Sequence, residues 1–537
     1  MRPIALLLVV GCAGTKQQTP GVLRFVNQEP VLAVNDHKPI PPPKKFDPGL
    51  VEYYWHEDII VTTREALTAT PPRPAANVNS LGDVPNSAWF VNREPTPAQI
   101  RRGPGGDGPD QSEPWRVIGV KVGGAAIGIT IEDARHDRYV IKFDEPKYPE
   151  AESATDVIVQ RLTWAMGYNV PENNVVTFNR DRLVLDAKAE MRFRTGDKRK
   201  MTKADLDRFL ALVDSGQGTF RALASKLIDG KIVGGIEPAG VRAGDANDRV
   251  PHELRRDLRG QRLLWAWVDH VDLKSQNSLA TYTDDHYIKW YAIDFGESLG
   301  IGALTNPEPR LGYSQSLSIR RMLASLVTFG LHVEPWERDL KYPKLRGLGE
   351  FESTMFEPGA WESNHHWRPM ETADRFDEFW AAEKLMRLSR AHIEAAVEAG
   401  RYTDPRAAAY IVQTLLERQR KIGRYAFSRV APLSRFDVSE RGTRLDLCFD
   451  DLWLVYGYGM PRDTVYSVRS FDYAGRMLGA AARYRASASR VCIPNVATGA
   501  DHEAYTMVKL DVRQMPPMFV HLARGPRGMR VIGIDRR

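Results

Sequence analysis

Residues 270–277 read His-Val-Asp-Leu-Lys-Ser-Gln-Asn, and residues 294–296 read Asp-Phe-Gly. Asn277 follows Asp272 by five positions, so one tight loop can present both side chains. Asp294 comes seventeen positions after Asn277 and is preceded by the run Tyr-Ala-Ile. These two short motifs thus supply a lysine, an asparagine and two aspartates at fixed spacing.

Further motifs lie upstream of this pair. Residues 138–143, Arg-Tyr-Val-Ile-Lys-Phe, read as a strand that carries Lys142. The apolar spacing over 150–166 predicts a helix after it, which ends at Gly167. Before the strand, two strand-like runs flank a glycine-rich connection that holds Gly123, Gly124 and Gly128.

Taken in order, the glycine-rich connection, the strand lysine, the helix and the two polar motifs resemble the protein-kinase-like superfamily. The resemblance covers roughly residues 116–430 and implies a two-lobed, kinase-like α+β fold. The implied activity is an ATP- and Mg²⁺-dependent transfer of phosphate to a hydroxyl of a protein or small molecule, with the substrate unspecified.

The resemblance also implies a role for each polar residue. Lys142 would hold the α- and β-phosphates, while Lys274 would neutralise charge on the γ-phosphate. Asp272 would orient the accepting hydroxyl and take up its proton. Asn277 and Asp294 would share the Mg²⁺ ions, hard cations that prefer oxygen ligands. Backbone amides of small residues would approach the triphosphate at Gly123, Gly124 and Gly128.

The chain departs from eukaryotic kinases in several places. Val271 replaces the arginine that normally pairs with a phosphorylated loop, so regulation of that kind is not expected. The stretch that ends in the turn 167–171 resembles HipA-type kinases, in which an acidic residue precedes a similar turn. Asp156 is the candidate partner of Lys142; Glu152, one helical turn earlier, is the rival, and two solvated side chains are the third interpretation.

The first twelve residues resemble a bacterial lipoprotein signal: a charged start, a short apolar run and Gly11-Cys12. The resemblance implies cleavage before Cys12, diacylation of its thiol and a lipid anchor in the cell envelope. Ala13, in place of aspartate, favours the outer membrane. The alternative is an unprocessed cytoplasmic N-terminus. The polar, proline-rich residues that follow predict an extended tether.

The region from 434 onward changes to short alternating runs, which predict a β-sandwich of about six strands, with one of them at 452–456. Cys448 and Cys492 both lie in this region, either as one disulfide or as two buried thiols. Helices are predicted at 374–398 and 404–426, and 186–252 is expected to be irregular apart from a helix capped by Thr202.

The expected organisation has six parts. In order they are a signal peptide at 1–11, a lipidated tether at 12–50, a docking segment and linker at 51–115, a first lobe at 116–186, a second lobe with an insertion at 187–430, and a β-domain at 434–537.

The composition sets few limits on function. The 537 residues carry 74 basic and 68 acidic side chains, a formal net charge of +6 that does not call for a nucleic-acid partner. Two alternatives to a phosphotransferase stay open. One is a non-catalytic, lipid-anchored scaffold, because free ATP is scarce outside the cytoplasm; the other is transfer of AMP on a kinase-like fold.

Overall fold

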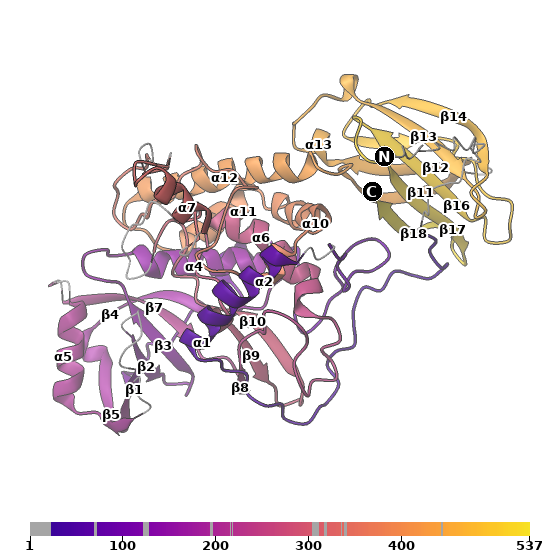
Figure 1. Ribbon diagram of the computed structural model, residues 1–537. Helices are drawn as coiled ribbons and strands as arrows, with labels where there is room; N and C mark the ends of the chain where they lie inside the picture. Colours follow the sequence, from indigo (N-terminus) through magenta and orange to yellow (C-terminus); the bar gives the residue numbers. More distant parts are fainter. Residues whose placement is uncertain are drawn as a thin grey trace, which may run out of the picture. The chain divides into compact units, whose positions relative to one another are not determined.

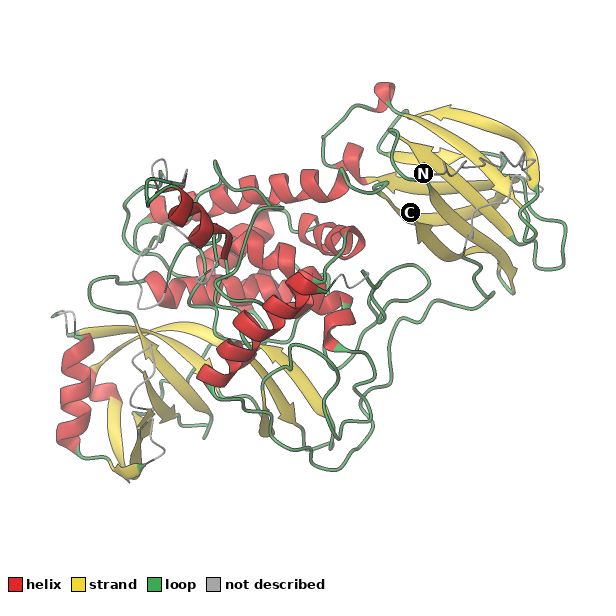
Figure 2. Cartoon of the chain, in the orientation of Figure 1, coloured by secondary structure: helices red, strands yellow, loops and turns green. Residues whose placement is uncertain are grey.

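The computed structural model describes residues 23–68, 72–121, 128–193, 197–214, 216, 218–302, 311–315, 319–334, 336–337, 341–441 and 444–537. The chain divides into two compact units. Val31–Pro432 form the larger unit, and the described residues up to Pro30 form the smaller one with Leu433–Arg537. Sheets and helices build the larger unit, whereas strands dominate the smaller (Figure 1, Figure 2). The predicted fold class, α+β with a C-terminal all-β part, is confirmed.

A seven-stranded sheet in the larger unit has the order β4-β7-β3-β2-β1-β5-β6. Tyr139, Ile141 and Phe143 alternate along β3 and are buried in the core, so Lys142 between them faces the other side of the sheet. The strands are β1 Trp115–Lys121, β2 Gly128–Glu132, β3 Arg138–Phe143, β4 Asn173–Asn179, β5 Leu183–Arg192, β6 Lys198–Lys200 and β7 Thr219–Lys226.

Strand β7 corrects the expectation of an irregular segment over 186–252. It pairs with β4 on one side and with β3 on the other, so this sheet continues well beyond residue 186. Its inward residues Phe220, Ala222 and Ala224 are buried, but two of them are small, which hid the alternation in the sequence. The predicted helix of this segment does form, with Thr202 in a capping box.

A three-stranded sheet, in the order β10-β9-β8, and a group of helices complete the larger unit. The strands are β8 Lys231–Gly234, β9 Ser278–Tyr282 and β10 Ile288–Ala292. The helices are α1 Leu50–Tyr54, η1 Trp55–Val61, α2 Thr62–Leu67, α3 Pro97–Arg102, α4 Ala151–Ala165, α5 Lys203–Val213, α6 Arg256–Val268, α7 Ile319–Val327, α9 Arg368–Glu371, α10 Arg375–Met386, α11 Arg390–Ala399 and α12 Pro405–Phe427.

The helix predicted over 374–398 is in fact two helices, α10 and α11. Ser389 starts α11 in a capping box with His392, and this local capping ends the preceding helix. The helix predicted over 404–426 is present as α12, with Asp404 as its N-cap and proline at its first position.

The smaller unit contains two sheets, of orders β11-β12-β15 and β14-β13-β16-β17-β18. The described residues of this unit form eight strands rather than about six. They are β11 Leu433–Arg441, β12 Arg444–Asp451, β13 Val465–Phe471, β14 Met477–Arg485, β15 Arg490–Ile493, β16 Thr506–Val512, β17 Met518–Gly525 and β18 Gly528–Arg536. Cys448 of β12 and Cys492 of β15 are register partners and form a disulfide, one of the two states that the sequence left open.

The strand predicted over 452–456 is wrong. Residues Leu452–Val455 form a short helix, α13, because Asp451 accepts the backbone N–H of Trp453 at 3.1 Å and caps the first turn. Leu452 and Leu454 are buried, so the apolar alternation was read correctly but assigned to the wrong structure.

The proline-rich segment before residue 50 has little regular structure, as expected of a tether, but its described part is bound along its length. Phe25 belongs to the smaller unit, where its backbone N–H donates to the hydroxyl of Tyr505 at 3.1 Å. Phe46 belongs to the larger unit and forms a bridge with Gly234. In the described part of the chain, no helix has the length and apolarity needed to cross a bilayer.

Candidate active site

Lys142 is held on β3 opposite Gly128 of β2. The two strands approach so closely there that a Cβ atom on Gly128 would lie 2.9 Å from the carbonyl oxygen of Ile141, so glycine is required. The ammonium of Lys142 is 2.7 Å from the Oδ1 atom of Asp294. The lysine of the upstream strand and the aspartate of the Asp-Phe-Gly motif, 152 residues apart, therefore form one ion pair.

The hairpin β9–β10 explains the spacing between Asn277 and Asp294. Ser278 begins β9 and pairs with Ala292, which ends β10, so the residues just outside the hairpin also meet. The backbone N–H of Ile293 donates to the carbonyl of Asn277 at 3.3 Å. Asp294 follows with a positive φ of 62°, a conformation that asparagine and aspartate tolerate better than most residues.

The loop at 270–277 begins where α6 ends, at Asp269, whose φ of 53° stops the helix. Asp272 is 7% exposed and is the centre of the loop. Its carboxylate accepts from the ammonium of Lys274 at 2.7 Å and from the amide of Asn277 at 2.7 Å. The three residues predicted as catalytic thus lie together as one bonded group.

Helix α4 brings two carboxylates to the same place. Asp156 is 1% exposed and accepts from the side-chain amide of Asn173 at 2.5 Å and from the backbone N–H of Phe295 at 3.1 Å. Glu152 lies against Gly296, where a Cβ atom would come within 2.8 Å of its Cγ. Within the described residues neither carboxylate is in ion-pair contact with Lys142, whose partner is Asp294. Asp156 instead braces the backbone of the Asp-Phe-Gly motif.

Carboxylates outnumber the two lysines at this site, and burial raises the pKa of several of them. Burial raises the pKa of Glu152 to about 7 and that of Asp156 to about 6. Burial, together with the charge of Asp272, raises the pKa of Glu297 to about 8. The charge of Lys142 holds the pKa of Asp294 below its usual range. Sequence reasoning missed Glu297, although it directly follows the Asp-Phe-Gly motif.

The donor set fits Mg²⁺. No group of three or more His, Cys, Asp or Glu side chains in the described ranges is arranged to hold a metal ion by itself. Mg²⁺ does not need one, because it is usually bound through one or two protein oxygens, with waters and phosphates as the other ligands. Asp294 supplies a charged oxygen that is 45% exposed, and Asn277 lies beside it across the hairpin. The charges of Asp272 and Asp294 add to the effect of burial on the pKa of Glu297, and a cation bound here would relieve this repulsion.

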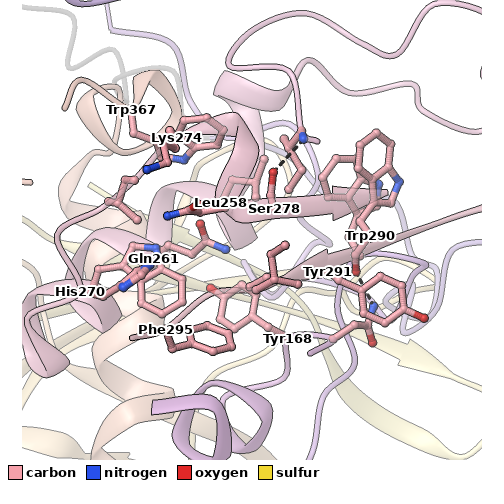
Figure 3. Close-up of a pocket in the computed structure, with 18 residues that line it drawn as sticks. Tyr168, Leu258, Gln261, His270, Lys274, Ser278, Trp290, Tyr291, Phe295 and Trp367 are labelled. Carbon is pink, nitrogen blue, oxygen red and sulfur yellow. Dashed lines mark hydrogen bonds between the residues drawn. The ribbon is translucent and has the colours of Figure 1, made fainter. Parts of the chain in front are cut away.

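A small cavity of about 40 Å³ is lined in part by residues of the loop at 270–277 (Figure 3). His270 and Phe295 line it, and the ring nitrogen Nδ1 of His270 is 2.9 Å from the hydroxyl of Ser298. Burial lowers the pKa of His270 to about 4, so the imidazole is neutral at pH 7. The cavity is too small for a nucleotide.

The helical segment around α1 contacts the loop at 270–277. The amide of Gln276 donates to the carbonyl of Pro48 at 3.2 Å, just before α1 begins. The ring of Tyr54 stacks on His365 with centroids 4.3 Å apart, and Asp58 bonds His365 at 3.0 Å. Burial raises the pKa of the Tyr54 hydroxyl. The charge of Lys274, in the loop at 270–277, lowers this pKa, and the charge of Asp272 raises it.

Three predicted site residues lie outside the described residues, namely Gly123, Gly124 and Cys12. Their assignments stay predictions.

No family model and no curated protein matches the chain. Among solved structures it is similar to a Helicobacter pylori proinflammatory kinase, CtkA, over 57% of this chain and 94% of that one, with 11% identity and a TM-score of 0.30. It is also similar to a Golgi casein kinase with Mn and ADP bound, over 59% of this chain and 72% of that one, with 9% identity and a TM-score of 0.28. A further structure of the Golgi casein kinase covers 59% and 76%, with 9% identity and a TM-score of 0.23. Similarity at this level carries no functional argument, so the site assignment rests on the contacts above.

Proposed function

We propose that the chain is an ATP- and Mg²⁺-dependent phosphotransferase that acts on a hydroxyl. The observation that carries the proposal is the ion pair of Lys142 and Asp294 at 2.7 Å, next to the bonded group at Asp272. Five residues from three separate segments of the chain are brought together there. They carry the charges that phosphoryl transfer needs, because this reaction depends mainly on positioning and on charge stabilisation.

Each residue has a definite task in this proposal. Lys142 and Lys274 stabilise negative charge on the phosphates at the two sides of the cleft. Asp272 accepts the proton of the attacking hydroxyl, and the amide of Asn277, at 2.7 Å, keeps its carboxylate in place. Asn277 and Asp294 are the residues that would hold Mg²⁺, which supplies Lewis-acid stabilisation of phosphate charge when bound.

Nucleotide binding is the first test. We expect Mg²⁺-ATP to stabilise the parent protein by about 2.7 kcal/mol at 100 times its dissociation constant, and Asp294→Ala to remove that stabilisation. Asp272→Asn should retain the stabilisation but lower the transfer rate by about 10²–10⁴-fold. Thermal denaturation and release of ADP are the two measurements.

The outcomes separate the alternatives. If no nucleotide stabilises the protein, the proposal that it is an enzyme is overturned. Stabilisation without transfer would identify a binding scaffold. Label transferred from the α-phosphate rather than the γ-phosphate would identify an AMP transferase.

We further propose that Cys12 is diacylated and anchors the protein in the cell envelope, at the outer membrane. The resemblance of the first twelve residues to a lipoprotein signal that ends at Cys12 supports this location, as does the lack of aspartate at position 13. In cells fed labelled palmitate, the parent protein should be labelled and Cys12→Ala should not. Equal labelling of both would exclude the anchor.

A further inference from the structure

Strands β14, β13 and β16 are neighbours in the five-stranded sheet of the smaller unit, and their basic residues share one face (Figure 1). Arg469 of β13 is the register partner of Lys509 of β16. Ser467, two positions before Arg469 and therefore on the same face, is the partner of Arg483 of β14. Arg485 follows two positions after Arg483 and lies on this face as well. We call the four basic residues of these strands the basic face.

Most of the positive charge on this face has no compensating carboxylate. Lys509 pairs at 3.2 Å with Asp511, the one acidic residue of the three strands. Arg469 and Arg483 are exposed, and no ion pair joins either of them to a carboxylate within the described ranges of the chain. Arg485 is exposed too, and its guanidinium donates to an uncharged backbone carbonyl. Like charges directly opposite each other destabilise a sheet, so an anion bound between Arg469 and Lys509 would relieve their repulsion.

The first described residues lie at the edge of the same sheet. The guanidinium of Arg24 donates to the carbonyl of Tyr473 at 3.0 Å, two positions after β13 ends. Leu23, the first described residue, follows Cys12 by eleven positions, a length of chain that spans at most about 40 Å when fully extended. A lipid on Cys12 would therefore keep the basic face close to a membrane surface.

Exposed apolar side chains next to the basic face favour a membrane over a dissolved polyanion. Tyr473, between β13 and β14, is 57% exposed, and Leu23 is 59% exposed. Met477 is 55% exposed and is the register partner of Phe471, which places it on the face that carries Arg469. Charged headgroups and the apolar boundary of an anionic bilayer match both kinds of side chain, whereas a dissolved polyanion would meet only the charges.

We propose that the basic face docks the smaller unit onto an anionic lipid surface. The choice of a lipid as the partner rests in part on the proposed acylation of Cys12, and the contact does not depend on the proposed phosphotransfer. A lipid anchor and a basic surface reinforce each other, because binding through one makes binding through the other intramolecular.

The test is co-sedimentation of the full chain with vesicles of phosphatidylcholine, alone or with 30% phosphatidylglycerol. Cys12→Ala is present throughout to remove acylation. The basic-face variant adds Arg469→Gln, Arg483→Gln and Arg485→Gln. A matched control removes the same charge at exposed positions of the larger unit, by Arg208→Gln, Arg249→Gln and Arg424→Gln. A third variant replaces the three arginines of the basic face by lysine.

We expect the parent and the control to bind the anionic vesicles and the basic-face variant to bind at least tenfold more weakly, because the attraction of each basic side chain to an anionic surface adds to the others. The lysine variant should bind about as well as the parent, since it keeps the charge. Binding should be weak on neutral vesicles and should fall as the salt concentration rises.

Equal binding by the parent and the basic-face variant would overturn the proposal, and so would equal losses in that variant and the control. If the parent fails to bind anionic vesicles but binds polyphosphate through the same arginines, the partner is a dissolved polyanion and the lipid proposal is wrong. Palmitate labelling of the chain with Cys12 intact is a separate measurement. Labelling without vesicle binding would overturn the docking and leave the anchor, whereas vesicle binding without labelling would overturn the anchor and support the docking.

Discussion

Asp156 and Asp294 are two carboxylates of the same site that differ in how deeply they are buried. Asp294 is 45% exposed and pairs with Lys142, so it stays charged and reachable from solvent. Asp156 is 1% exposed, and its carboxylate oxygens accept hydrogen bonds from the side-chain amide of Asn173 and the backbone N–H of Phe295. The outer carboxylate is suited to bind a cation, and the inner one fixes the loop that carries it.

Glu297 gives a pH prediction at the same scale. Its pKa is raised to about 8 by burial and by the charge of Asp272, so the folded protein holds a proton there that the unfolded chain releases near its ordinary pKa. The stability that Glu297 contributes is fully present below its pKa in the unfolded chain. It is lost as the pH rises through about 8, its pKa in the folded protein. We expect the free energy of unfolding to fall by on the order of 1 kcal/mol between pH 6.5 and 8.5 without divalent cations.

Urea unfolding followed by tryptophan fluorescence measures this change, because only Trp453 of the 12 tryptophans lies in the smaller unit. Glu297→Gln should reduce the pH dependence to the part that Glu152 contributes with its pKa of about 7, and Mg²⁺ should weaken the dependence in the parent. His270, with a pKa of about 4, is neutral throughout this range and does not contribute. A slope that is unchanged in Glu297→Gln would contradict the assignment.

At the scale of elements, the sequence predicted best where the spacing was long and regular. Strand β3, helix α4 and helix α12 were all expected from periodicity, and the two polar motifs do meet, where the carbonyl of Asn277 accepts from the backbone N–H of Ile293. Prediction was worse where a single contact decides the structure. Asp451 turns an alternating run into the helix α13, and the buried side of β7 is made partly of alanine. Glu297 carries no motif, and only the fold brings it to the loop.

The position of the segment that contains α1 leads to a prediction about access to the loop at 270–277. Tyr54 stacks on His365, and the charges of Lys274 and Asp272 act on its hydroxyl. We expect Tyr54→Ala to raise the rate at which ATP is hydrolysed, with water as the acceptor, by several-fold. Trp55→Ala is the control, since Trp55 is the next residue and is 59% exposed. An unchanged rate in Tyr54→Ala would show that the segment does not limit access.

At the scale of the whole molecule, the disulfide belongs to the smaller unit alone. Cys448 and Cys492 enclose a loop of 44 residues, and in the chain-entropy model such a link contributes about 4 kcal/mol. Replacing both by serine should destabilise the smaller unit by about 2–4 kcal/mol. Calorimetry should show one transition moving, while the tryptophan transition of the larger unit stays in place. Equal movement of both would show that the units unfold together.

The first described residues and the last strands of the chain complete the same unit. The backbone N–H of Phe25 bonds Tyr505, 480 residues away, and the guanidinium of Arg530 bonds Asn27 at a separation of 503. During synthesis Phe25 must therefore wait for the 480 residues up to Tyr505 before it finds its partner. The residues of the larger unit are all made before the smaller unit can be completed. A truncated or stalled chain would thus leave its earliest segment without its binding surface.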